Sequence, residues 1–212
     1  MHFGIFIYDG VEPIDLGTYG VLSMARRVAP QIRVTTVAAQ AGPVYFANHL
    51  EVIACHGLPD APDFDALIVT GGPGWEAQCR HAPTLDYLRR RVAGGRLVAA
   101  VCTGGMILAA SGVLDGRIAT TKQEVIAGAE VPPLARLRDE YPQVRARNAL
   151  LADSGLVVTG GGVTLCIDVT LYLLERLLGA DVASETARIM EYGAAREANR
   201  SRLPTLLGAP RA

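Results

Sequence analysis

The chain has 212 residues, of which half are hydrophobic and 19% are charged, a composition that fits one domain with a full core. Its formal net charge is −1, with 20 basic and 21 acidic residues, so there is no electrostatic footprint for nucleic acid. The apolar runs are too short to span a membrane. No signal peptide opens the chain, so we expect a cytoplasmic protein.

The four cysteines, Cys55, Cys79, Cys102 and Cys166, are widely and irregularly spaced. They form no CxxC pair, and the four histidines make no metal-binding spacing with them. We therefore expect no metal site and, in a reducing compartment, no disulfide.

The N-terminal part predicts a strand over residues 3–8, a helix that ends near residue 28, and a second strand over 32–38. Asp15 precedes that helix and has two interpretations. It can cap the helix or lie in its first turn as a structural acid. It can also be a functional carboxylate at the carboxyl end of the first strand, and the two interpretations are compatible.

Residues 42–53 predict a small hairpin with Asn48 near its turn, and residues 66–70 predict a buried strand that ends in Gly71-Gly72-Pro73-Gly74. This loop loosely matches the dinucleotide pattern GxGxxG/A. No acidic residue follows about twenty positions later, as nucleotide binding requires. We expect instead that the amides of Gly71 and Gly72 face a catalytic residue and stabilise negative charge, as in an oxyanion hole.

After a helix predicted over residues 83–94, the stretch LVAAVCTGGMILAA at residues 97–110 carries the strongest signal. A short apolar strand meets Cys102, and Thr103, two glycines and an apolar helix follow. This is the pattern of a nucleophile elbow with sulfur in place of oxygen, where first-turn amides and the helix dipole favour a thiolate. The alternative is an inert buried cysteine.

The remaining chain predicts strands at 118–121, 144–147, 150–152 and 156–159, and helices at 122–127, 134–140, 163–178 and 181–192. Strands that alternate with helices indicate an α/β three-layer sandwich with a mostly parallel sheet. Its glycine loops and the elbow are expected to form one crevice. We expect a single domain over residues 1–195 and a loosely packed C-terminal tail over 196–212.

With these motifs assembled, the chain resembles the DJ-1/PfpI superfamily, which has the flavodoxin-like, class I glutamine amidotransferase-like fold. The resemblance spans roughly residues 3–192 and is carried by residues 10–16 (GVEPIDL), 70–74 (TGGPG), 100–121 and 157–179. Within the superfamily the chain looks most like isonitrile hydratases and the related domain of AraC-type regulators.

The resemblance implies that Cys102 is the nucleophile, that Asp15 is the acid facing it, and that Thr103 and Gly72 line the site. It also implies a small-molecule substrate, no cofactor and a homodimer. The family's histidine after the elbow helix is replaced by Lys122. A second departure is Gly17-Thr18-Tyr19-Gly20, which replaces the usual Gly-Pro and acid.

The expected activity is cysteine-dependent hydration of an isonitrile to an N-substituted formamide, through a covalent thioimidate on Cys102. One alternative is another cysteine activity of the superfamily, such as a stress-related hydrolase or deglycase. Another is a non-catalytic ligand-sensing domain. Because no DNA-binding segment follows the last predicted helix before Ala212, we expect an enzyme rather than a regulator.

Overall fold

The computed structural model describes residues 1–208 and contains a central eight-stranded sheet. All neighbouring strands in this sheet are parallel except β10 and β11, which pair antiparallel. Across the sheet the strands are β12 (Thr205–Leu207), β10 (Leu151–Asp153), β11 (Val157–Gly160), β7 (Leu97–Ala100), β6 (Ala66–Val69), β1 (His2–Phe6), β2 (Arg33–Ala38) and β5 (His56–Gly57).

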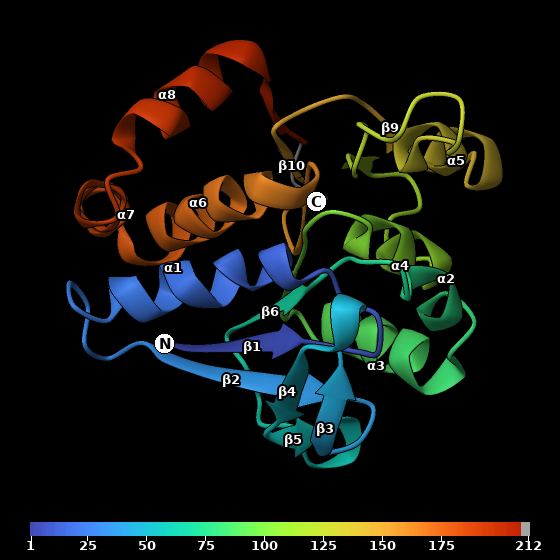
Figure 1. The fold of residues 1–212 in the computed structure, drawn as a ribbon, viewed down its shortest axis with the longest axis horizontal. Helices are drawn as coiled ribbons and strands as arrows, with labels where there is room; N and C mark the ends of the chain where they lie inside the picture. Colours follow the sequence, from blue (N-terminus) through green and yellow to red (C-terminus); the bar gives the residue numbers. More distant parts are fainter. Residues whose placement is uncertain (209–212) are drawn as a thin grey trace.

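Two groups of helices flank the sheet (Figure 1). In the first group α1 packs on α6 and α7, and in the second α4 packs on α2 and α3. The helices are α1 (Gly17–Ala25), α2 (Trp75–Gln78), α3 (Ala82–Ala93), α4 (Gly104–Ala110), α5 (Pro133–Glu140), α6 (Cys166–Leu178), α7 (Ala180–Ile189) and α8 (Gly193–Arg202). The predicted three-layer α/β fold with a mostly parallel sheet is confirmed.

Short elements connect these layers. They are the 3₁₀ helices η1 (Pro13–Leu16), η2 (Ala47–His49), η3 (Leu58–Asp60) and η4 (Val163–Leu165), and the strand pairs β3 (Gly42–Tyr45) with β4 (Glu51–Ala54) and β8 (Ile118–Ala119) with β9 (Arg145–Ala146). The β3–β4 hairpin was predicted, and Asn48 near its turn has the left-handed φ of 58° that asparagine tolerates.

The core follows from the apolar strands. Every residue of β6 and β7 is buried, because parallel strands in the middle of a sheet are covered on both faces. Phe3, Phe6 and Phe64 are among the largest side chains that are fully buried. This core supports the carboxyl ends of the strands, where the candidate site lies.

The predicted helix at residues 122–127 is wrong, since this segment is irregular. A run this short cannot offset the cost of helix nucleation without packing, and Val125 and Ile126 are β-branched. The ammonium of Lys122 donates to the carbonyl of Glu124 and holds the segment in a loop.

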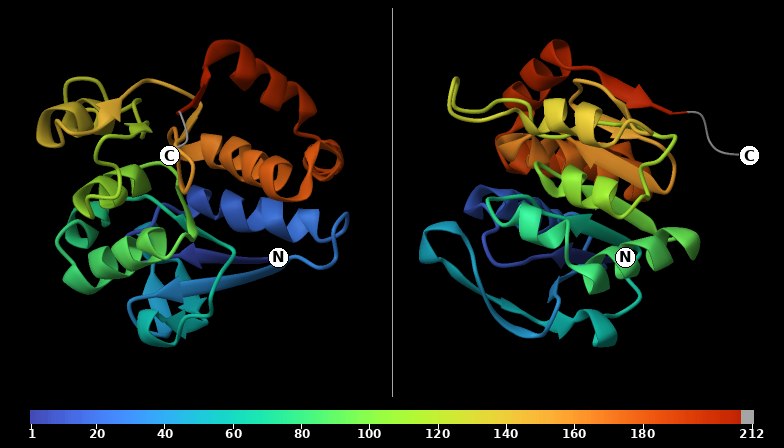
Figure 2. Two further views of the ribbon diagram at one scale, coloured as in Figure 1. Left: turned by 180° about the vertical axis from the view of Figure 1, so that it is seen from behind. Right: turned by 90° about the vertical axis from the view of Figure 1, so that its right-hand side faces the viewer.

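Residues 196–208 of the expected tail contain regular structure that the sequence did not indicate. Arg196 is buried in α8 and pairs with Glu175 at 2.8 Å, and β12 adds a parallel strand beside β10 at the sheet edge (Figure 2). Residues 205–207 are too short for their pattern to reveal a strand, which forms only because β10 offers an open edge. Residues 209–212 of the predicted tail lie outside the described part.

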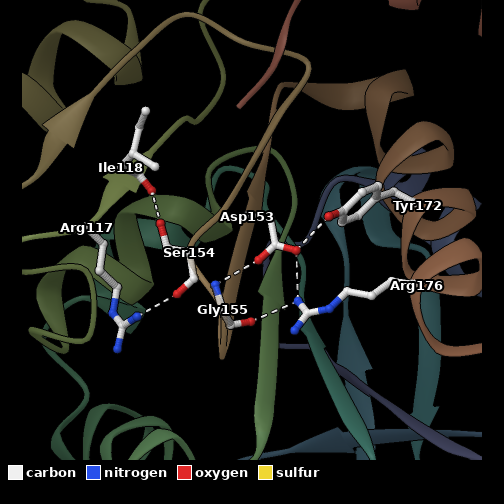
Figure 3. Close-up of polar contacts among 7 residues, drawn as sticks. All are labelled: Arg117, Ile118, Asp153, Ser154, Gly155, Tyr172 and Arg176. Carbon is white, nitrogen blue, oxygen red and sulfur yellow. Dashed lines mark hydrogen bonds and ion pairs between the residues drawn. The ribbon is translucent and has the colours of Figure 1, made fainter. Parts of the chain in front are cut away.

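The turn after β10 is tied to α6 by Asp153, as Figure 3 shows. Its Oδ2 accepts the Tyr172 hydroxyl at 2.6 Å and Nη1 of Arg176 at 3.0 Å, and its Oδ1 accepts the Gly155 amide at 2.8 Å. The carboxylate therefore joins the single antiparallel turn of the sheet to the helix that covers it. Within residues 1–208, no helix combines the length and apolar character needed to cross a membrane.

Candidate functional site

Cys102 lies on a sharp turn between β7 and α4, as the elbow pattern predicted. Its φ is 51°, a left-handed conformation that is uncommon for a residue with a side chain. The turn is held by the Cys102 amide, which donates to the Gly161 carbonyl at 3.0 Å, and by Thr121, whose hydroxyl donates to the Cys102 carbonyl at 2.7 Å. A Cβ at Gly104 would lie 2.4 Å from a carbonyl oxygen of β6, so the turn requires glycine there.

Asp15 is fully buried in η1, and its side chain caps no helix. Its Oδ2 accepts the Gly71 amide at 2.6 Å, whereas its Oδ1 is buried without a hydrogen-bond partner among the described residues. Burial raises the pKa of Asp15 to about 7, although the Gly71 hydrogen bond opposes the rise. A carboxyl that exchanges its proton near neutrality suits acid–base chemistry.

The amides of Gly71 and Gly72 were expected to be open for an oxyanion, but both are occupied. Gly71 donates to Asp15, and Gly72 donates to the Thr103 hydroxyl at 2.9 Å. A Cβ on Gly71 would lie 2.8 Å from the Cβ of Cys102, so the loop passes directly against the elbow. The structure therefore brings all five predicted site residues together, with the glycine loop as a link between Asp15 and the Thr103 side chain.

The Cys102 side chain is only 2% exposed. Burial raises the pKa of its thiol to about 12, and the charge of Asp15 acts in the same direction. The thiol pKa is lowered by backbone hydrogen bonds from Val163 and Thr103 and by the charge of Lys122. These backbone amides favour the thiolate, as expected, but burial and the Asp15 carboxylate raise the thiol pKa by more than the amides lower it. Asp15 therefore loses its proton at a lower pH than the thiol does.

Val163 was not foreseen as a site residue. It has a φ of 52° and begins η4 directly after the glycines that follow β11, which turns its amide toward the sulfur. The run Gly160-Gly161-Gly162 at a strand end was the available signal. A second strand-to-helix turn at the same sheet edge supplies a donor that the linear pattern does not reveal.

A cavity of about 820 Å³ opens above Cys102. Its apolar wall includes Trp75, Val125, Val131, Pro133 and Val163. Its polar lining residues are Glu12, Thr103, Lys122, Glu130, Arg136 and Glu140. The predicted crevice at the strand ends is thus present, and its wall is completed by α2, α5 and the loop over residues 122–132.

Arg136 organises one side of this cavity. Its guanidinium lies 4.6 Å from the centre of the Trp75 ring and pairs with Glu76 at 2.5 Å and Glu140 at 2.6 Å. These contacts join α2 to α5 across the cavity. The linear sequence does not reveal this cluster, because Arg136 and Glu76 lie 60 residues apart.

Fold and site together define a parallel α/β protein with a buried cysteine on a strand-to-helix elbow and an acid from the first strand's loop beside it. The chain belongs to the DJ-1/PfpI family, whose model matches residues 3–176. The family resemblance inferred from the sequence motifs is confirmed.

The relatives differ in what they do. The chain is 31% identical to isonitrile hydratase of Pseudomonas putida over 92% of this chain and 80% of the relative. It is 26% identical to the HTH-type transcriptional regulator GbdR of Pseudomonas aeruginosa over 95% of this chain but only 53% of the regulator. The crystal structure of Drosophila melanogaster DJ-1beta superposes with a TM-score of 0.75 at 20% identity, over 90% of this chain and 97% of that one.

Proposed function

We propose that this protein hydrates isonitriles to N-substituted formamides with Cys102 as the nucleophile and Asp15 as the proton carrier. The observation that carries the proposal is the buried Asp15 carboxyl, which has a pKa of about 7 and an unpartnered oxygen, and whose charge acts on the Cys102 thiol. The similarity to isonitrile hydratase supports this choice of substrate class.

In the first step the ionised Asp15 takes the thiol proton while the sulfur of Cys102 attacks the terminal carbon of the isonitrile. A C–S bond forms, and Asp15 delivers the proton to the same carbon. The product is a thioimidate in which the former isonitrile carbon carries one hydrogen and a double bond to nitrogen. The amides of Val163 and Thr103 favour the sulfur as it develops negative charge.

In the second step water adds to the thioimidate carbon, with Asp15 as the base that takes one proton from it. The nitrogen gains a proton, the C–S bond breaks, and the sulfur leaves and regains its proton. The sum is the addition of one water to the isonitrile, with no change in oxidation state and no cofactor. The Thr103 hydroxyl holds the Gly72 amide, so it positions the loop that carries Gly71 to Asp15.

The cavity supports a substrate with an apolar substituent. The side chains of Trp75, Val125, Val131 and Pro133 line a wall against which a cyclic or branched alkyl group can pack. An isonitrile presents only a small polar head, which suits a cysteine that is only 2% exposed.

The direct test is an assay with cyclohexyl isocyanide in which formamide release is followed by chromatography. We expect no turnover in Cys102→Ala and at least a hundredfold loss in Asp15→Asn, because general acid–base catalysis contributes about 10²–10⁴-fold. Cys55→Ser is the matched control, since Cys55 is exposed and lies outside the cavity. Full activity of Cys102→Ala would exclude the proposal.

Ligand sensing is the second candidate, favoured by the similarity to the regulator GbdR. A sensor would bind a small molecule in the cavity and release no product. Calorimetric binding of cyclohexyl isocyanide or its formamide without formamide formation, unaffected by Cys102→Ala, would support this candidate. A homodimer and a cytoplasmic location are also proposals, to be tested by light scattering and by cell fractionation.

A further inference from the structure

Lys122 is the single lysine of the chain, since the other 19 of the 20 basic Lys and Arg residues are arginines. It lines the same cavity as Cys102. An ammonium is a compact charge on a flexible stem, whereas a guanidinium is broad and planar. One basic position of this protein therefore differs in chemistry from all the others, and that position is in the wall of the cysteine cavity.

Several contacts hold Lys122 in place. A Cβ built on Gly162 would lie 2.7 Å from the Cγ of Lys122, so the lysine stem packs directly on this glycine. The Lys122 carbonyl accepts the Leu134 amide at 3.0 Å, and its ammonium donates to the Glu124 carbonyl. The stem thus lies on the loop that leads into Val163, whose amide faces the sulfur.

The charge of Lys122 is not neutralised by a neighbouring carboxylate, unlike that of Arg136. Arg136, another cation of the cavity lining, is matched by two carboxylates, Glu76 and Glu140. Lys122 forms no ion pair with any residue in 1–208, and its ammonium donates to the backbone carbonyl of Glu124. Its positive charge therefore acts on the cavity without a fixed counterion.

We propose that Lys122 is a positioning residue of this site, whose ammonium favours the thiolate of Cys102 against the neighbouring Asp15 carboxylate. The charged groups that act on the Cys102 thiol are Asp15 from η1 and Lys122. The cysteine in turn acts on Tyr8 after β1 and on Cys166 at the start of α6. Among these groups only Lys122 is a cation. The inference concerns the ionisation of Cys102 and holds whichever substrate the cysteine takes.

The test measures the rate at which iodoacetamide alkylates Cys102 between pH 7 and pH 9, followed by mass spectrometry of the Cys102 peptide. Lys122→Met keeps a similar stem and removes the charge. We expect alkylation at pH 8 to slow roughly three- to tenfold and the pH profile to move to higher pH, because a nearby opposite charge favours the ionised form. Lys122→Arg keeps a positive charge and should recover most of the rate.

A second measurement needs no variant, because the chain has one lysine. Acetylation removes the charge of Lys122, whereas reductive methylation keeps it, and both reagents also modify the amino terminus. We expect slow alkylation of Cys102 only in the acetylated protein. Equal rates in acetylated and methylated protein would overturn the proposal, as would a Lys122→Met profile identical to that of the wild type, or a Lys122→Arg variant as slow as Lys122→Met.

Discussion

Replacement of Asp15 by asparagine should stabilise the protein at alkaline pH while it removes the acid–base group. Asp15 is fully buried, its Oδ1 has no partner among residues 1–208, and its Oδ2 accepts the Gly71 amide. Asparagine has the shape of the protonated acid and can still accept that amide. The variant should therefore keep the fold and avoid a buried charge.

The magnitude follows from the pKa of Asp15, which burial raises from 3.8 to about 7. A carboxyl with a raised pKa binds its proton more tightly in the folded state, so its contribution to stability is full below pH 3.8 and is lost as the pH rises to about 7. At about 1.4 kcal/mol for each pH unit, the loss reaches roughly 4 kcal/mol at pH 8. About 3 kcal/mol of that loss falls between pH 5 and pH 8.

The assay is urea unfolding of wild type and Asp15→Asn at pH 5 and pH 8. The other titrating groups are common to both proteins, so the difference between the two pH dependences isolates Asp15. We expect the wild type to lose about 3 kcal/mol more than the variant over this range. The reasoning would be refuted if the free energies of unfolding of the two proteins changed equally between pH 5 and pH 8. It would also be refuted if Asp15→Asn were less stable than the wild type at pH 8, because the buried carboxylate would then not destabilise the fold.

Three other predictions concern the elbow, the sheet edge and the reaction. Gly104→Ala should destabilise the fold by roughly 3 kcal/mol or more, because the new methyl carbon would lie 2.4 Å from a backbone oxygen; thermal melting should show no such loss in Gly20→Ala, where nothing lies within 4 Å. Asp153→Ala should cost about 2–3 kcal/mol in urea unfolding, and Tyr172→Phe about 1 kcal/mol, because the first removes a carboxylate that accepts three hydrogen bonds and the second removes only one of these bonds. For the isonitrile reaction kcat/KM should rise with pH to a plateau above about 7, as Asp15 ionises and can accept the thiol proton; a flat profile from pH 5 to pH 8 would contradict this role.

Local patterns were sufficient for the elements that are buried on both faces and for the elbow itself. The apolar strand before Cys102 and the glycines after it could be recognised in a single stretch, because the strand, the turn and the helix start are contiguous. The same reasoning failed at residues 122–127, where packing rather than propensity decides the conformation. It also missed β12, which forms only against β10.

The sequence by itself determined the fold class, the family and the two groups on which the proposed chemistry rests, Cys102 and Asp15, because parallel strands bring their carboxyl ends to one edge. Only the tertiary structure decided how those groups ionise and which amides they use. The Gly71 amide binds Asp15, and one of the two amides that hydrogen-bond to the sulfur comes from Val163, about 60 residues away in the chain. Burial depth and the direction of single N–H groups depend on how distant segments pack, and no local pattern of residues encodes them.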